Sequence, residues 1–209
     1  MFLMVTRSEP DYAWDFCGGH LAIDFTNTVG SRGGVSEEHF NTYADVVSWA
    51  EARGVIGRAD AQRLRREAAR RPAAAAEALA SVVALREAVY RVIAAVASGR
   101  KPAGGDLARV NASVGASLSG AHLRPHGGRL ELSFARAGAP ALHEPIVTPV
   151  VRAAIDMLTT AAIQRVRSCA DESCAWLFVD TTRSGTRRWC DMKVCGNRNK
   201  VRRFREEQP

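Results

Sequence analysis

The chain has 209 residues, 46% of them hydrophobic and 24% charged, which is typical of a globular protein and not of a disordered one. Charged side chains interrupt its most alanine-rich stretch, 72–97, so we expect no membrane-spanning helix and no membrane partner. Residues 1–16 lack the basic start and the cleavage site of a signal peptide, which predicts a cytoplasmic protein with reduced thiols.

In chain order, the apolar pattern predicts a mostly helical body. Alternation of Leu21, Ile23 and Phe25 with smaller or polar residues predicts a half-buried strand over 21–28. Helices are expected at 43–53, 61–71, 72–98, 106–118 and 147–166, and a hairpin at 123–134. The helix over 72–98 has the clearest apolar periodicity, and Gly99 is expected to end it.

The segment 18–28 also brings three polar side chains together among glycines: His20, Asp24 and Asn27. One hypothesis is that they line a pocket for a small ligand. The alternative is that Asp24 and Asn27 cap or bridge a turn while His20 is a half-buried side chain with its own partners. The chain contains no nucleophile elbow, phosphate-binding loop, zinc-protease motif or dinucleotide fingerprint, so we do not expect an enzyme.

The net charge of +7 is concentrated near the C-terminus. Residues 165–209 hold eleven Lys or Arg against six Asp or Glu, whereas residues 1–164 hold 18 against 16. A near-neutral body followed by a basic segment is typical of an anion-binding module attached to another domain. We therefore expect two domains, 1–164 and 165–209.

Four of the five cysteines lie in the basic segment, as two C-x4-C pairs: Cys169 with Cys174, and Cys190 with Cys195. Two sulfurs from each short loop complete the tetrahedron that Zn²⁺ prefers, so the sequence predicts one bound zinc ion. Four thiolates leave no open position, which makes the site structural, and metal binding supplies folding free energy to a short segment. The alternatives are unrelated buried cysteines, two disulfides, or an iron site of the rubredoxin type.

These residues resemble a known family. The run Cys-Gly-Asn-Arg at 195–198, within Trp189–Lys200, is similar to the signature of the CGNR zinc-finger family, and Cys169–Asp180 fits the same finger. Gly18–Thr28 resembles the start of the domain that usually precedes it. The resemblance implies a bacterial, stress-induced transcription regulator with a ligand-sensing N-terminal domain and a DNA-binding finger. The four cysteines carry over as zinc ligands by direct motif match.

After Cys195 the sequence predicts a short helix, Gly196–Glu207. We expect Val194, Val201 and Phe204 to form an apolar edge that seals the zinc core. The expected fold class is therefore α+β: a predominantly α-helical body with a few strands and a hairpin, followed by a small treble-clef- or ribbon-like zinc finger.

The basic residues of the finger predict duplex DNA as the partner. Asn197 and Arg198 are expected at base edges, because Asn pairs with adenine and Arg with guanine. The other candidate DNA contacts are Arg183, Arg187, Arg188, Lys193, Lys200, Arg202, Arg203 and Arg205. A homodimer or a small-molecule effector in the body would position the finger.

Other roles for the basic residues stay open at this point. Some of them compensate the charge of −2 on a zinc ion with four thiolates, or they bind RNA or an acidic protein. The alternative function is a zinc-stabilised protein-interaction or small-molecule-binding protein without DNA binding.

Overall fold

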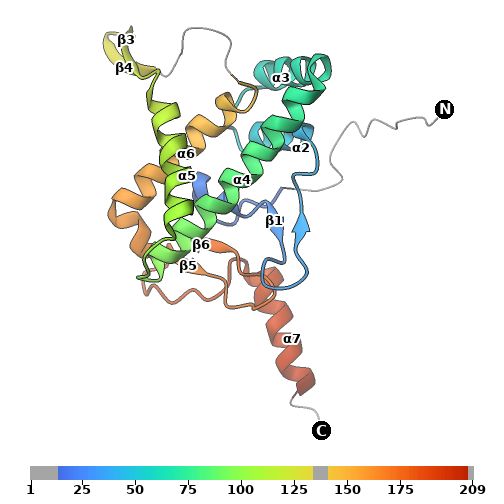
Figure 1. Cartoon of the computed structure of the whole chain (residues 1–209). Helices are drawn as coiled ribbons and strands as arrows, with labels where there is room; N and C mark the ends of the chain where they lie inside the picture. Colours follow the sequence, from blue (N-terminus) through green and yellow to red (C-terminus); the bar gives the residue numbers. More distant parts are fainter. Residues whose placement is uncertain (1–13, 134–140, 207–209) are drawn as a thin grey trace, which may run out of the picture.

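The computed structural model describes residues 14–133 and 141–206 (Figure 1). Its helices are α1 (Leu21–Thr26), α2 (Tyr43–Ala52), α3 (Arg58–Arg70), α4 (Pro72–Ala97), α5 (Gly104–Leu118), α6 (Glu144–Thr159) and α7 (Asn197–Glu206). Its antiparallel strand pairs are β1 (Val29–Gly30) with β2 (Glu37–Glu38), β3 (His122–His126) with β4 (Arg129–Ser133), and β5 (Val166–Ser168) with β6 (Leu177–Val179). The expected α+β class with a predominantly helical body is confirmed.

The long helix α4 organises the body. It contacts α1, α2, α3, α5 and α6, and it runs diagonally across Figure 1. Val82, Leu85, Val89 and Val92 are buried at three- and four-residue spacing, as the sequence predicts for one apolar helix face. Pro72 occupies the first turn, where its missing N–H costs nothing, and Gly99 with φ +70° follows the last turn.

The strand expected at 21–28 is wrong, because residues 21–26 form helix α1 in the centre of the core. Ala22, Ile23 and Phe25 are fully buried, and α1 contacts both α4 and α6. His20 caps the helix, with its Nδ1 accepting a hydrogen bond from the Ala22 N–H at 3.3 Å. A six-residue helix that is buried on nearly every side has no polar face. The alternation of large apolar with smaller or polar residues along this segment therefore could not distinguish the period of a helix from that of a strand.

The other expected elements are found with shifted ends. Helix α6 begins at Glu144, three residues early, and stops at Thr159; the remainder of the expected helix is a 3-10 turn, Ala161–Arg165, and strand β5. The β3–β4 hairpin turns at Gly127 and Gly128, whose φ values of +55° and +78° are those of a tight hairpin turn. The expected ends at Phe134 and Glu207 lie outside the described residues.

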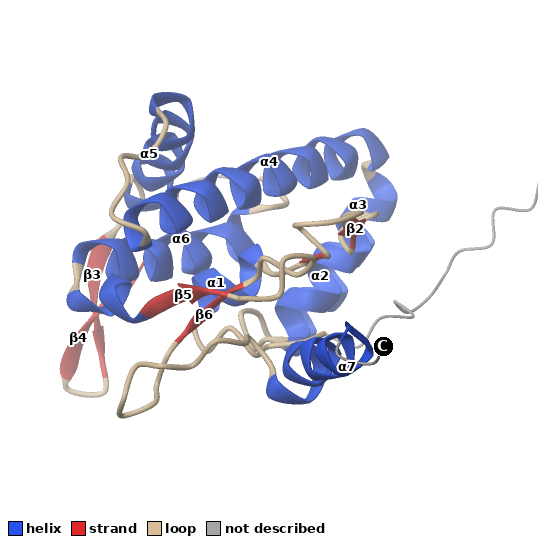
Figure 2. Ribbon diagram, turned by 90° about the horizontal axis from the view of Figure 1, so that it is seen from below, coloured by secondary structure: helices blue, strands red, loops and turns tan. Residues whose placement is uncertain are grey.

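Strands β5 and β6 connect the C-terminal finger to the helical body. Val166 and Leu177 belong to the same hydrophobic core as α1, α4 and α6, and Figure 2 shows both strands beside α1. The Trp176 indole N–H donates to the carbonyl of Val29 at 2.6 Å, and the Val179 N–H donates to the carbonyl of Gly18 at 2.9 Å. No helix in the described ranges has the length and apolar character needed to cross a bilayer.

Candidate metal centre and nucleic-acid interface

The four clustered cysteines meet at one point of the finger. Cys169, Cys174, Cys190 and Cys195 are all buried, and their Sγ atoms lie within 4.8 Å of one another. The Sγ atom of Cys190 is 3.6 Å from those of Cys174 and Cys195, which is too far for a disulfide. Sulfurs bound at about 2.3 Å to one tetrahedral ion would be about 3.8 Å apart. The geometry and the all-sulfur donor set therefore fit the single structural Zn²⁺ that the sequence predicts.

The close approach of the four sulfurs alters the pKa values of the cysteines. Hydrogen bonds from the Cys174 and Cys190 thiols lower the pKa of Cys169 to about 2, because they stabilise its thiolate. The same thiolate raises the pKa of Cys174 and of Cys190 far above the usual range, and burial raises the pKa of Cys195. A divalent ion bound by the four sulfurs would stabilise all four as thiolates.

Two aspartates shape the loops that carry the cysteines. In the first loop the carbonyl of Asp171 accepts from the Cys174 N–H at 2.9 Å, and its Oδ1 accepts from the Ser173 N–H at 3.1 Å. In the second loop the Oδ1 of Asp191 accepts from the N–H groups of Lys193 and Val194, at 2.6 and 3.0 Å. The second loop continues as a π-helical turn, Met192–Gly196, which leads directly into α7.

Arg198 lies beside the metal cluster. Its Nε is 3.0 Å from Asp171 Oδ2, and its two terminal nitrogens donate to Ser173 Oγ at 3.3 Å and to Cys195 Sγ at 3.4 Å. This guanidinium group therefore neutralises part of the negative charge of the thiolates and joins α7 to the first cysteine loop. The expected contact of Arg198 with a base edge stays a prediction, and reaching a base would require these bonds to break.

Sequence reasoning missed two residues of this centre, Asp171 and Asn199. Asn199 is buried at the start of α7, and its Nδ2 donates to Asp171 Oδ2 and to the Cys195 carbonyl, both at 2.9 Å. The position of Asp171, within the first cysteine loop, was the one available signal, because Asp often caps such turns. Nothing in the local sequence distinguishes Asn199 from the exposed polar residues around it.

The expectation that Val194, Val201 and Phe204 seal the zinc core is wrong. Their exposed fractions are 55%, 49% and 63%. Asn199 takes the inward position on α7, which turns Val201 and Phe204 toward solvent. The buried side chains around the cysteines are instead Trp176 and Phe178, with the half-buried Trp189 against them.

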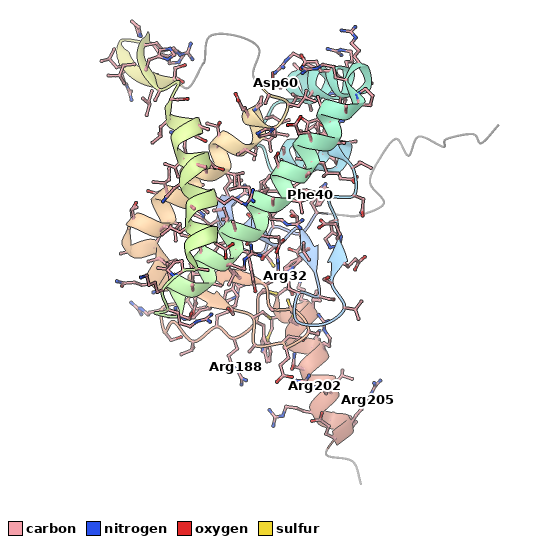
Figure 3. The ribbon with its side chains drawn as sticks, viewed as in Figure 1. Arg32, Phe40, Asp60, Arg188, Arg202 and Arg205 are labelled. Atoms are coloured by element: carbon pink, nitrogen blue, oxygen red, sulfur yellow. The ribbon has the colours of Figure 1, made fainter. Side chains whose placement is uncertain are left out.

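The remaining candidate DNA contacts divide by exposure. Arg187 is half-buried: its guanidinium lies 4.5 Å from the centre of the Phe178 ring and donates to the carbonyls of Trp189 and Cys190. The exposed candidates are Arg183, Arg188, Lys193, Asn197, Lys200, Arg202, Arg203 and Arg205. Figure 3 shows Arg202 and Arg205 along α7, which extends away from the body, and Arg188 on the loop before the second cysteine pair.

The three candidate ligand residues of the N-terminal segment each have a partner within the protein. Asp24 is buried, and its carboxylate accepts from Arg53 Nε at 2.8 Å and from the Gly18 N–H at 3.0 Å; burial raises its pKa to about 6. The amide of Asn27 bonds both backbone groups of Leu177 in β6. His20 caps α1. These contacts correspond to the structural alternative stated above.

Comparison with known families agrees with this architecture. A model of the ABATE family, described as "putative stress-induced transcription regulator", matches residues 19–161. A model of the CGNR zinc finger matches residues 165–208, which include all four clustered cysteines. No curated protein matches the chain.

Proposed function

Because the chain belongs to the ABATE family and carries a CGNR zinc finger with one structural zinc site, we propose that it regulates transcription by binding duplex DNA through α7. In this proposal residues 165–209 are the DNA-binding finger and residues 1–164 the regulatory body. Both families are of regulator or zinc-finger type, and a zinc ion held by four thiolates has no open position for catalysis.

The observation that carries the proposal is the shape and chemistry of α7. The helix has ten residues, so it is about 15 Å long, and it leaves the finger pointing away from the helical body (Figure 1). Such a helix fits the major groove of B-DNA, which is about 12 Å wide. The finger supplies a rigid base, because Asp171 binds both Asn199 and Arg198 of α7.

The inward position of Asn199 defines which face of α7 is outward. Successive residues of a helix are about 100° apart, so Asn197, Val201 and Phe204 lie opposite Asn199. Lys200 and Arg205 flank them on either side. In the proposal this outward face contacts DNA: the two cations bind phosphates, and the central side chains meet base edges and thymine methyl groups.

Charge compensation of the zinc site accounts for only part of the basic surface. Arg198 lies next to a cysteine sulfur, and Arg187 donates to backbone carbonyls, so these two belong to the finger's own structure. Lys200 and Arg205 are exposed on the outward face of α7, away from the sulfurs. A polyanion is the partner whose charge matches such a surface.

The experiment is a titration of zinc-loaded protein into an arbitrary DNA duplex across a salt series, read by fluorescence anisotropy. Six phosphate contacts would give a log–log salt slope of roughly −5, and Lys200→Ala with Arg205→Ala should make that slope shallower by about 2. Arg66→Ala with Arg70→Ala is the matched control, because it removes the same charge from exposed positions of α3, at the opposite end of the molecule (Figure 1).

Two results would contradict the proposal. Absence of binding even at low salt would favour the alternative in which the finger docks an acidic protein or only stabilises a small-molecule-binding body. An equal loss in both double variants would mean that net charge, and not the face of α7, governs the interaction.

A further inference from the structure

A cavity of about 960 Å³ lies between α4, α5 and α6, and none of the four clustered cysteines lines it. This volume is at the upper end of the range of small-molecule sites, about 300–1,000 Å³. Leu85 of α4 and Val147 of α6 line it and are themselves buried, so they form its apolar base. Neither His20, Asp24 nor Asn27 is among its lining residues.

The cavity exists because α5 presents small side chains to it. Gly105, Ala108, Ala112 and Ala116 recur at three- and four-residue spacing and all line the cavity. Side chains of this size cannot fill the space between α5 and the other two helices, whereas Val110, one of the buried residues of α5, packs into the core. Small residues alone would indicate only how the helices pack. The polar groups that line the cavity indicate whether a ligand binds there.

Two polar groups of the cavity wall lack a usual hydrogen-bond partner within the described part of the chain. Ser117 lines the cavity with an exposed fraction of 7%, and its hydroxyl has no hydrogen-bond partner within the described part of the chain. Pro149 lies inside α6 and has no N–H to donate to the carbonyl of Pro145, which also lines the cavity. The Ser117 hydroxyl and the Pro145 carbonyl can therefore form hydrogen bonds with a ligand in the cavity.

The charged lining residues indicate which ligand charge the cavity favours. Arg109 of α5 and Arg152 of α6 are exposed lining residues, opposed by the single carboxylate of Glu144. Burial lowers the pKa of the remaining ionisable lining residue, His143, which favours its neutral form. Two guanidinium groups and one carboxylate therefore line the cavity beside its apolar base, with Asp106 near Arg109 and Glu77 near His143 outside the lining. Guanidinium groups bind carboxylates through paired hydrogen bonds.

We propose that this cavity is a binding site for a small organic acid, with its apolar body over Leu85 and Val147 and its carboxylate at Arg109 and Arg152. The hydroxyl of Ser117 gives such a ligand a further hydrogen-bond partner inside the cavity. Ligand binding in this cavity does not require DNA binding.

The test is thermal unfolding of the zinc-loaded full-length chain with 2-naphthoate and octanoate, each compared with its uncharged amide. At an acid concentration about ten times Kd, the unfolding midpoint should rise by about 3–6 °C. The amides should give clearly smaller shifts, because they have no charge for the two arginines. Arg109→Ala with Arg152→Ala should make acid and amide equal.

A cavity-filling variant separates this site from binding elsewhere. Ala112→Trp should abolish the acid-induced shift, whereas Asn111→Trp, an exposed neighbour on α5 that does not line the cavity, should leave the shift intact. Equal shifts for acids and amides with the wild-type chain, shifts that survive Ala112→Trp, or no shift at millimolar acid would each overturn the proposal. DNA titrations of the same samples report separately on the proposed function.

Discussion

Asp171 is 1% exposed beside the cysteine cluster, and both of its carboxylate oxygens accept hydrogen bonds. One oxygen holds Ser173 in the first cysteine loop, and the other holds Asn199 in α7, 28 residues later. A single buried side chain therefore sets the orientation of the helix relative to the metal site. Asn27 has the corresponding role between the finger and the body, because its amide bonds Leu177, 150 residues away.

The role of Asn27 leads to a prediction at the residue scale. Its Nδ2 donates to the Leu177 carbonyl at 2.9 Å, and its Oδ1 accepts from the Leu177 N–H at 3.2 Å. Asn27→Ala leaves both buried backbone groups without partners, so the free energy of unfolding should fall by about 2–4 kcal/mol. Urea denaturation measures this change.

Asn41→Ala is the matched control, because Asn41 is exposed and its side chain donates one hydrogen bond to the Glu38 carbonyl. We expect it to change the free energy of unfolding by less than about 1 kcal/mol. A similar small effect for Asn27→Ala would contradict the structural role and return Asn27 to the ligand hypothesis.

At the scale of elements, helix α7 is rotated about its axis so that its apolar residues face solvent and not the protein interior. A helix at a protein surface normally buries its apolar residues, yet α7 exposes Val201 and Phe204 and buries Asn199. The hydrogen bonds of Asn199 to Asp171 and to the Cys195 carbonyl explain this rotation. Exposed apolar side chains between two cations are typical of a contact surface rather than of a solvated one.

Val201 and Phe204 form the apolar centre of the outward face of α7, and we expect them to contribute to DNA affinity. Val201→Ser with Phe204→Ser should weaken DNA binding roughly tenfold, because the lost contacts bury apolar area. The salt slope should stay unchanged, since no cation is removed and the number of released counterions is the same. Anisotropy titrations across salt measure both quantities, and the thermal midpoint should hardly move because both side chains are exposed.

Leu130→Ser is the control for this pair, because Leu130 is an exposed apolar residue of the β3–β4 hairpin, 66% exposed and outside the finger. Its DNA affinity should equal that of the wild type. Unchanged affinity in the Val201 and Phe204 variant would restrict the DNA contact to the basic residues.

At the scale of the whole molecule, the first cysteine loop is docked on the body through the backbone of residues 32–33. The N–H of Arg32 donates to the Cys174 carbonyl at 3.1 Å, and the N–H of Gly33 donates to the Ser173 carbonyl at 3.2 Å. The Arg32 guanidinium pairs with Glu87 of α4 at 2.8 Å. The metal site and the longest helix of the body are therefore connected through one short loop.

Gly33 tests this docking. A Cβ at Gly33 would lie 1.6 Å from the carbonyl oxygen of Glu172, so Gly33→Ala must displace the first cysteine loop from the body. We expect a thermal midpoint lower by about 4 °C or more and faster loss of zinc to a chelator, because the loop that carries Cys174 loses its support.

Gly34→Ala makes the same chemical change at the next residue, where the nearest atom to the added Cβ is 3.7 Å away. It should leave the midpoint and the rate of zinc loss close to those of the wild type. Identical behaviour of the two variants would show that the loop is not held against the finger in solution.

The features that were predicted correctly from the sequence depend on short-range spacing. Two C-x4-C pairs specify four sulfurs for one ion whatever the rest of the chain does, and the structure brings those sulfurs together. The apolar period of residues 72–97 likewise specifies a helix with one buried face, because the pattern is long enough to define its own period.

The features that were missed depend on partners far away in the chain. Residues 21–26 alternate like a strand, but burial between α4 and α6 makes them a helix, and a run of six residues is too short to reveal its own period. The orientation of α7 depends on Asp171, 28 residues earlier, and the cavity on how far apart three helices pack. Spacing along the chain therefore specified the metal site and the main helices. The exposed face of α7 and the cavity between α4, α5 and α6 follow from contacts that form only when distant segments meet.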